Sequence, residues 1–565
     1  MRAESVDAGA DVPKNEISAS GAAVTEPAQR GYADLHEHLD ALKKRGLLVT
    51  VDRPVDKDAE LHPLVRWQFV GGIAETERKA FLFTHVTDGR GRKYAHPVVV
   101  CAIAANREIY SVGMGVPVDQ IGAKWDEAIA HPIAPRLVER AICQEVVHEG
   151  ADLIGEGKGL DWLPIPISTP GFDSAPTLTA TNVITRDPET GVQNMGTYRA
   201  ALKASNRLVV RMSTRAGGAG GYLHYQKCQK LGIKRMPCAI VLGCPPLVAF
   251  VAPQKMPLGV DEITIAGGLA GEPINIVKAH SLDLLVPAES EIVIEGTIDT
   301  EYCEPEAPYG ESHGHVALEE FNMPMRITAI THRRNPVVSS YISQVTPSES
   351  SVIKRVAYEP LYLAHLRDAL GIRGVKRVSF HEPLTGLRRI VMITLAKGTS
   401  RAEVWRALYG ASSFRSDTGK ICVAVNEDID PENSDALLWA ISYRSNPVRD
   451  IKIIEPRGLG HGPSRESGEA QDSALLVDAT MKEDLPPLAL PKQEYMQRAK
   501  AIWEELKLPA LHPQAPWHGY SLGDWLPQWD AAALRAVRGN YLENGRISEK
   551  LRKKGVKPET KYRPE

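Results

Sequence analysis

Residues 177–202 read TLTATNVITRDPETGVQNMGTYRAAL, and this stretch decides how we expect the middle of the chain to fold. Its first part, 177–185, is rich in β-branched side chains, which pack well on the pleated surface of a strand. The run DPETG at 187–191 has turn chemistry, and a second strand is expected around 195–202. The stretch therefore predicts a β-hairpin.

Strand signals continue beyond this hairpin to about residue 345, separated by turn-forming residues and by one expected short helix over residues 223–231. The strands are expected over residues 207–213, 239–242 and 291–298, and over a last pair at 325–330 and 337–342. Many strands with turns between them predict a barrel or closed sheet, and we expect this domain over residues 166–347.

The region before the barrel mixes helix and strand. Leu35, Leu39 and Leu42 recur at helical spacing. Further elements are expected as strands over 47–51, 80–83 and 98–101 and as helices over 119–130 and 135–148. These signals predict an N-terminal α/β domain over residues 31–165, behind a flexible arm over residues 1–30.

The region after the barrel alternates between strand and helix. Helices are expected over 349–369, 400–410 and 433–442, and strands over 375–380, 389–395, 421–425 and 451–454. This alternation predicts a C-terminal α/β domain with a mainly parallel sheet over residues 348–490. Residues 456–490 are expected to cross the surface, and 491–565 to supply a terminal helix at 493–506 and a basic tail that contacts another subunit.

Composition excludes several classes of protein. A chain of 565 residues is too long for one hydrophobic core, so about three domains are expected. The net charge of −3 argues against a general nucleic-acid binder. The seven cysteines contain no CxxC pair, which indicates a reducing compartment, and we expect a cytoplasmic protein. No apolar run approaches the roughly 18 residues of a membrane span, so no membrane association is expected.

The densest group of titratable residues lies at 304–315, EPEAPYGESHGH, with three carboxylates and two imidazoles. Its prolines and glycine disfavour a helix, so these side chains are expected to project from a shaped loop. A catalytic loop and a plain acidic surface turn both fit. In a strand, Glu311, His313 and His315 would share one face and could hold zinc or iron for hydrolysis. A non-catalytic assembly protein is the third possibility.

Three further features precede this loop. Asn194 and Arg199 stand five residues apart, so on a regular strand they face opposite sides, and their use at one site requires a bulge or a ligand wrapped around the edge. The run RAGGAGG at 215–221 precedes a helix and suits either phosphate binding or a mobile loop. Asp261 and Glu262 open another expected helix, where capping is the simpler explanation.

In combination, these features resemble the UbiD family of reversible decarboxylases, which use prenylated FMN with a divalent metal and potassium. Asn194-x4-Arg199, the glycine run, Gly259-Val260-Asp261-Glu262 and Glu306-x4-Glu311 stand in the order and approximate spacing of that family. The resemblance covers roughly residues 32–505. It implies a multidomain α/β protein whose central domain is a split β-barrel of the flavin-binding kind.

The resemblance also implies roles for individual residues. Arg199, Glu306 and Glu311 match the catalytic network, with Glu311 at the proton-donor position. The cofactor contacts that it implies are Thr197, Tyr198, Arg199, Arg211, Met212, Ser213, Arg215, Gly217 and Lys420.

The implied metal site departs from the family pattern. Asn194 and Glu262 match two ligands of the divalent metal, Mn2+ or similar, that ties the cofactor phosphate to the protein. The family usually offers a histidine just before its glycines, but that place here reads Thr214-Arg215-Ala216. His224 is the nearest substitute, so either it has taken over or the metal site is altered; Arg215 could itself neutralise phosphate.

The implied reaction is the reversible, non-oxidative decarboxylation of an aromatic, heteroaromatic or α,β-unsaturated acid, including aromatic acyl-CoA thioesters such as phthaloyl-CoA. Loss of CO2 from an sp2 carbon leaves an unstabilised carbanion, so the modified flavin must act as electron sink through a transient covalent adduct. Of two neighbouring carboxylates one stays protonated while an arginine keeps the other ionised, which gives Glu311 the acid role and Glu306 an orienting role. The resemblance further implies a flavin prenyltransferase that supplies the cofactor, and a homodimer or homohexamer.

Overall fold

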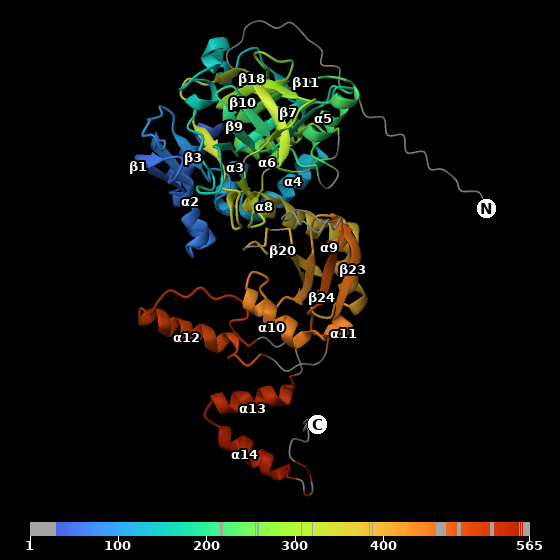
Figure 1. Ribbon diagram of the computed structural model, residues 1–565. Helices are drawn as coiled ribbons and strands as arrows, with labels where there is room; N and C mark the ends of the chain where they lie inside the picture. Colours follow the sequence, from blue (N-terminus) through green and yellow to red (C-terminus); the bar gives the residue numbers. More distant parts are fainter. Residues whose placement is uncertain are drawn as a thin grey trace, which may run out of the picture.

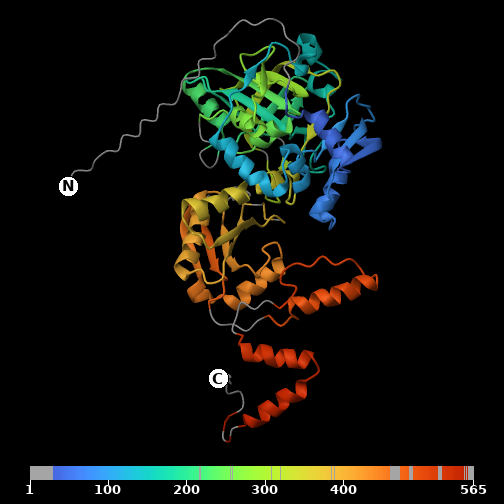
Figure 2. The same ribbon diagram turned by 180° about the vertical axis from the view of Figure 1, so that it is seen from behind.

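The structure is a computed structural model that describes residues 30–557 apart from 215–217, 255, 257–258, 307, 319, 384, 387, 459–470, 483–487, 520–524, 553 and 555. Figures 1 and 2 show it from opposite sides: the N-terminal and central parts form one body, the C-terminal sheet lies against it, and α8 lies at their junction. Within the described ranges, no helix has the length and apolar character needed to cross a bilayer.

The N-terminal part contains a four-stranded sheet in the order β1-β2-β3-β19, flanked by helices. Its strands are β1 (Leu48–Asp56), β2 (Ala80–Thr87), β3 (Val98–Val100) and β19 (Val338–Ser340), and its helices are α1 (Leu35–Lys44), α2 (Leu61–Val70), α3 (Arg107–Met114) and α4 (Ile121–Ala130). The expected strands and the helix near 119–130 are confirmed. Strand β19 joins this sheet and not the preceding strand of the barrel, so the expected pairing of 325–330 with 337–342 is wrong.

The helix expected over residues 135–148 is also wrong. The segment forms β4 (Arg136–Leu137), a short 3-10 turn and β5 (Val146–Glu149). Strand β5 pairs antiparallel with β18 (Phe321–His332), with His148 opposite Ile330. The backbone hydrogen bonds of that pairing override the local helical pattern: β10 pairs only with residues 323–326 of β18, so residues 329–332 extend beyond it and offer unpaired backbone groups, which β5 takes up.

The central part is built on a ten-stranded sheet in the order β6-β9-β10-β18-β14-β11-β7-β8, with β5 and β15 paired to β18 off this path. The strands not yet given are β6 (Thr177–Leu178), β7 (Thr181–Arg186), β8 (Gln193–Gly196), β9 (Ala200–Ala204), β10 (Arg207–Val210), β11 (Arg235–Leu242), β14 (Ile292–Asp299) and β15 (Glu304–Pro305). The predicted hairpin is confirmed as β7–β8, with Val183 opposite Gly196.

The two ends of this sheet must lie together. Residues 179–180 alone connect β6 to β7, and residues 197–199 alone connect β8 to β9, although these strands stand at opposite ends of the strand order. Links of two and three residues span at most about 10–14 Å, so the sheet has to curl until its ends meet. This closure confirms the expected split barrel, and it breaks the strand expected around 195–202 into two.

Smaller elements surround the barrel. They are the helices α5 (Gly220–Lys230), α6 (Pro246–Val251) and α7 (Glu262–Ala270), the strands β12 (Asn275–Lys278) and β13 (Leu285–Pro287), and the short hairpin of β16 (Tyr309–Gly310) and β17 (Val316–Ala317). Asp34 and Glu37 form a capping box at the start of α1, which fixes the chain where it enters the fold.

The C-terminal sheet has the order β20-β21-β22-β24-β23, and the pairs β21–β22 and β22–β24 are parallel while both edge strands run antiparallel. Its strands are β20 (Val375–Phe380), β21 (Ile390–Leu395), β22 (Ile421–Asn426), β23 (Ile451–Gly458) and β24 (Gln471–Asp478); its helices are α8 (Glu349–Ala364), α9 (Arg401–Phe414), α10 (Ser434–Arg444) and α11 (Pro447–Asp450). The expected mainly parallel sheet is confirmed.

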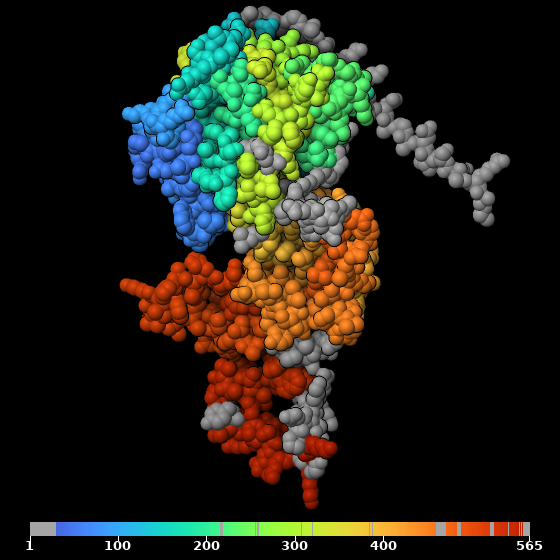
Figure 3. All heavy atoms as spheres, in the orientation of Figure 1, coloured from blue at the N-terminus to red at the C-terminus, as the bar shows by residue number. Residues whose placement is uncertain are grey.

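Strand β24 lies inside the stretch expected to cross the surface, so that expectation is wrong for residues 471–478. Ala474, Leu476 and Val477 are buried because β24 fills the gap between β22 and β23. Beyond the sheet, α12 (Gln493–Glu505) confirms the terminal helix, and α13 (Pro527–Val537) and α14 (Tyr541–Lys550) follow. In Figure 1, α13 and α14 stand off the C-terminal sheet, and in Figure 3 the C-terminal residues, coloured red, protrude from the rest of the molecule.

Candidate active site

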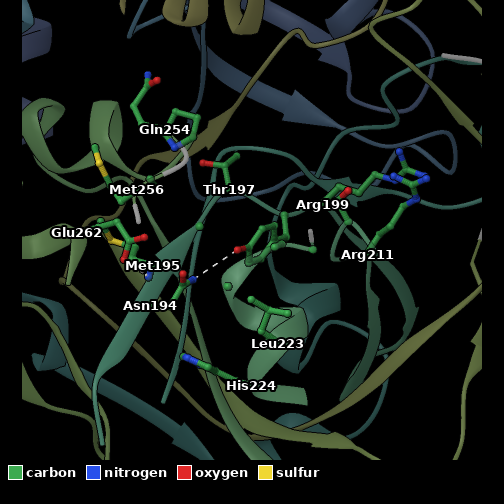
Figure 4. A pocket seen from close by; sticks show the side chains of 18 of the residues that line it. Asn194, Met195, Thr197, Arg199, Arg211, Leu223, His224, Gln254, Met256 and Glu262 are labelled. Atoms are coloured by element: carbon green, nitrogen blue, oxygen red, sulfur yellow. Dashed lines mark hydrogen bonds between the residues drawn. The ribbon is translucent and has the colours of Figure 1, made fainter. Parts of the chain in front are cut away.

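A cavity of about 880 Å3 opens between the barrel and the C-terminal part. Its walls come from β8, from the link between β8 and β9, from the start of α5 and from the first turns of α8. Figure 4 shows Asn194 near Glu262 on one side of this cavity and Arg199 near Arg211 on the other. A volume of this size lies near the upper end of the range of about 300–1,000 Å3 that is usual for ligand pockets.

The break between β8 and β9 explains how Asn194 and Arg199 reach the same cavity. Strand β8 ends at Gly196 and β9 begins at Ala200, so Arg199 lies in a non-strand link. The alternation of a regular strand does not apply there. A non-strand link where the barrel closes therefore takes the place of the bulge that a continuous strand would need.

Arg199 connects two carboxylates. Its Nε donates to Glu306 Oε1 at 2.6 Å and its Nη2 to Glu306 Oε2 at 3.0 Å, and its Nη1 donates to Glu311. Asn322 Nδ2 also donates to Glu306, at 3.1 Å. Glu311 lines the cavity, whereas Glu306 lies buried behind Arg199. Such a two-pronged guanidinium–carboxylate contact fixes the plane of the arginine.

A second arginine and a tyrosine complete this group. Arg211 Nη1 lies 3.6 Å from Glu311 Oε1 and Arg211 Nε lies 3.8 Å from Glu306 Oε2. The Arg199 guanidinium stacks 4.3 Å from the centre of the Tyr309 ring. Burial opposes the charge of Arg199, but the charges of Glu311 and Glu306 outweigh it and raise its pKa above the ordinary value. The guanidinium is therefore permanently charged.

The loop that carries Glu306 and Glu311 is shaped by Gly310. Its N–H donates to Asp173 Oδ1 at 3.1 Å, and a Cβ at this position would lie 2.4 Å from Thr169 Oγ1 and 2.9 Å from Gln344 Cγ. Only glycine fits this close approach. The hairpin β16–β17 therefore needs glycine directly before Glu311, which explains that part of the motif.

The histidines that follow do not join Glu311 in a metal site. Residues 311–315 form the turn of the β16–β17 hairpin, with Glu311 N donating to His315 O at 3.0 Å, so the one-sided strand required for a hydrolase is absent from this described segment. His315 is exposed. Among the described residues no group of three or more His, Cys, Asp or Glu side chains is placed to hold a metal, so the structure does not form the arrangement of Glu311, His313 and His315 that the hydrolase hypothesis requires.

Glu262, Asn194 and His224 line the opposite side of the cavity. Glu262 Oε2 accepts a hydrogen bond from Met195 N at 2.8 Å, and burial raises the pKa of Glu262 to about 7. Asp261 caps α7 by accepting from Ile263 N at 3.0 Å, so capping explains Asp261 but not Glu262.

His224 supplies an imidazole on the same side of the cavity as Asn194 and Glu262. Its Nδ1 lies 2.9 Å from Thr185 Oγ1, and burial lowers its pKa, which favours the neutral form that binds metals. An amide oxygen, a carboxylate and a neutral imidazole form a donor set suited to a divalent cation.

The glycine run packs against this set. A Cβ on Gly220 would lie 1.8 Å from Asn194 Oδ1, and a Cβ on Gly221 would lie 2.8 Å from Met212 Sδ. Glycines at the start of α5 therefore let the helix N-terminus approach the cavity wall.

The remaining predicted cofactor residues divide into three groups. Thr197, Tyr198 and Ser213 line the cavity. Met212 is buried in the wall, and Arg215 and Gly217 lie outside the described residues. The structure does not bring Lys420 to the cavity: its Nζ donates to both oxygens of Asp472 on β24, each at 2.7 Å.

The sequence missed the wall supplied by the C-terminal part. Lys354, Arg388 and Asp417 line the cavity there, together with Ser350 and Ile353. A weak signal was present, because Ser350, Ile353 and Lys354 share one face of the expected helix over 349–369. No local sequence pattern connects that face of the helix to Glu311. Only the packing of α8 in the structure shows that this face lines the cavity.

Three family models match the chain in order. The 3-octaprenyl-4-hydroxybenzoate carboxy-lyase N-terminal domain of the UbiD family matches residues 39–129, the Rift-related domain residues 136–345 and the C-terminal domain residues 351–479. Together these matches cover more than half of the chain.

Solved structures agree with them. An evolved dimeric form of the UbiD-class enzyme HmfF from Pelotomaculum thermopropionicum, in complex with prFMN, is 28% identical, with a TM-score of 0.70 over 83% of this chain and 99% of that chain. The vanillic acid decarboxylase of Sedimentibacter hydroxybenzoicus in closed form is 24% identical, with a TM-score of 0.68 over 85% of this chain and 100% of that chain, and it shares the fold. With all three domain models matched in succession, the chain belongs to the UbiD family of carboxy-lyases.

Proposed function

We propose that this carboxy-lyase reversibly decarboxylates an aromatic, heteroaromatic or α,β-unsaturated acid, with prenylated FMN in the cavity and Glu311 as the proton donor. The observation that carries the proposal is the bridge that Arg199 makes between buried Glu306 and cavity-lining Glu311. The proposed substrates include aromatic acyl-CoA thioesters, such as phthaloyl-CoA.

Each residue of the bridge has a separate task. Glu306 holds the Arg199 guanidinium in one plane, and Arg199 with Arg211 holds Glu311 at the cavity wall. The negative charge of an incoming substrate carboxylate favours the protonated form of Glu311. After CO2 departs, Glu311 delivers that proton to the former carboxylate carbon. The flavin, when bound, supplies the electron sink that the loss of CO2 requires.

The residues present fit a flavin phosphate and a divalent metal. The start of α5 presents Ala219 and Gly220 to the cavity, where the helix dipole favours a phosphate. Asn194, Glu262 and His224 would hold Mn2+ or a similar ion beside it, and K+ belongs to the same proposal. The buried Glu262 supports this assignment, because a carboxylate removed from water gains most from a cation.

The same proposal has consequences for the source of the cofactor and for the oligomeric state of the chain. HmfF is described in complex with prFMN and with FMN, so we infer that a flavin prenyltransferase must provide the cofactor for this chain. A homodimer or homohexamer is proposed because apolar side chains on the terminal helices stay exposed, such as Ile502 on α12 and Val537 on α13.

The test uses holoenzyme produced together with a flavin prenyltransferase. Bound flavin is measured by absorbance, and a panel of aromatic and unsaturated acids is followed in D2O by exchange and CO2 release. Glu311→Gln should lower both rates by about 10²–10⁴-fold, the usual contribution of a positioned acid. The matched control is Glu304→Gln, because Glu304 contacts Arg207 at 3.3 Å and does not line the cavity. Normal turnover and exchange in Glu311→Gln, or purified protein without flavin, would contradict the proposal.

A further inference from the structure

The first turns of α8 give the cavity a rigid wall. Ser350, Ile353 and Lys354 line it from one face of the helix. The helix is held at its start by Glu349, which accepts hydrogen bonds from Cys101 N at 3.0 Å and from Ile103 N at 2.9 Å. Ser348 adds a capping box. Lys354 is therefore presented to the cavity from a fixed position.

Lys354 is a cation that the described part of the chain leaves without a partner. It is half-buried and makes no hydrogen bond or ion pair with any described residue. The carboxylates that line the cavity nearby are already engaged, since Glu311 pairs with Arg199 and Asp417 pairs with Arg388. When Lys354 is protonated, the wall thus carries an uncompensated positive charge.

The surroundings of Lys354 disfavour its charged form. Burial and the charge of Arg388 lower the pKa of Lys354 to about 7, although Glu311 and Asp417 act in the opposite direction. A partly desolvated ammonium gains most when an anion arrives. The cavity is open to ligands, so that anion can be supplied by what binds there.

We propose that Lys354 binds a second, non-reacting anionic group of the acid substrate, and that the enzyme therefore prefers acids that carry an anionic oxygen group besides the carboxylate that is removed. This inference rests on the proposed function. The substrate class is a dianionic aromatic or unsaturated acid, of which a dicarboxylic acid is the simplest example.

The non-reacting group is the better partner for an energetic reason. The reacting carboxylate loses its charge as CO2 forms, so a cation bound to it would stabilise the ground state more than the transition state and slow the reaction. A spectator anion keeps its charge throughout. An ion pair with that group binds substrate and transition state equally, which lowers KM and leaves kcat unchanged.

The test is a binding titration of the flavin-loaded enzyme, followed by flavin absorbance at pH 6.5, a condition of the assay chosen as about half a unit below the Lys354 pKa. The ligands are the three benzenedicarboxylates, their monoamides and the matching hydroxybenzoates. Wild type should bind at least one dicarboxylate about 10- to 100-fold more tightly than its monoamide, as a charge-assisted hydrogen bond allows. Lys354→Met should remove this preference and Lys354→Arg should keep it. Lys376→Met is the control, because Lys376 is exposed on β20.

The outcomes separate the two proposals. Equal binding of dicarboxylates and monoamides by wild type, or an undiminished preference in Lys354→Met with normal flavin content, overturns the role of Lys354. Hydroxybenzoates that bind as tightly as dicarboxylates also overturn it, because their phenol is neutral at this pH. Missing flavin or missing exchange in wild type contradicts the proposed function instead. For any acid that is turned over, Lys354→Met should raise KM and spare kcat.

Discussion

The two walls of the cavity differ in whether their charged side chains are paired. On the barrel wall, the carboxylates of Glu306 and Glu311 both contact Arg199, and Arg211 lies within 4 Å of both. On the α8 wall, Lys354 has no such partner in the described chain, and its neighbours Arg388 and Asp417 pair with each other. Paired charges hold a fixed geometry for chemistry, whereas an unpaired one is available to a ligand.

The largest effect is expected when the barrel wall loses its central cation. Arg199→Met leaves Glu306 buried without the guanidinium that contacts both of its oxygens. Breaking a buried pair in this way costs about 3–5 kcal/mol, so the calorimetric transition of the central domain should move to a clearly lower Tm and turnover should be lost.

Arg207→Met is the matched control for that variant. Arg207 pairs with Glu304 at 3.3 Å, and its side chain is 39% exposed, so this change should cost at most about 1 kcal/mol. Equal shifts in Tm for the two variants would mean that the Arg199 bridge is no more important than a surface pair.

A smaller effect is expected when Glu311 is displaced while all the charged residues of the barrel wall are kept. Gly310→Ala places a Cβ against Thr169 and Gln344 and should push Glu311 away from its position. A displacement of about 1 Å at a catalytic group costs about 10²-fold in rate, so kcat should fall by that order while flavin stays bound. Gly545→Ala is the control, because a Cβ there meets nothing within 4 Å. An unchanged kcat in Gly310→Ala would show that the loop tolerates the shift.

The smallest effect is expected at the α8 wall and depends on pH. Lys354 has a pKa of about 7 in the presence of Arg388, Glu311 and Asp417, so it is charged below this pH and neutral above it. Binding of a dianionic acid should therefore weaken about tenfold between pH 6 and pH 8, relative to its monoamide. Lys354→Arg should remove this pH dependence, since arginine stays charged. A pH-independent ratio in wild type would contradict the assignment.

Much of the fold could be predicted because it follows local periodicity. Alternation, helical spacing and turn residues predict the hairpin at 177–202, the terminal helix and the strands of the C-terminal sheet other than β24. The misses share one cause. Residues 146–149 and 471–478 form strands because neighbouring strands offer hydrogen-bond partners, and no local pattern contains those partners.

The site residues also divide into those that the sequence could predict and those that depend on tertiary packing. The motif residues Asn194, Arg199, Glu306 and Glu311 could be chosen because their order and spacing resemble those of the UbiD family, and all four lie at or directly behind the cavity wall. Lys420 was placed there too, but an aspartate on the unforeseen strand β24 holds it elsewhere. Lys354 was missed because its significance depends on what surrounds it.

The sequence by itself determined the kinds of groups available: a permanently charged guanidinium, two carboxylates on a loop that glycine and proline shape, and a helix with one lysine on a cavity-facing side. The tertiary structure alone decided that Arg199 meets carboxylates 107 and 112 residues away, and that Lys354 meets none. The physical reason is range. Charges and hydrogen bonds act over a few ångströms, so their effect is set by the closure of the barrel and the docking of α8, which no local pattern of residues contains.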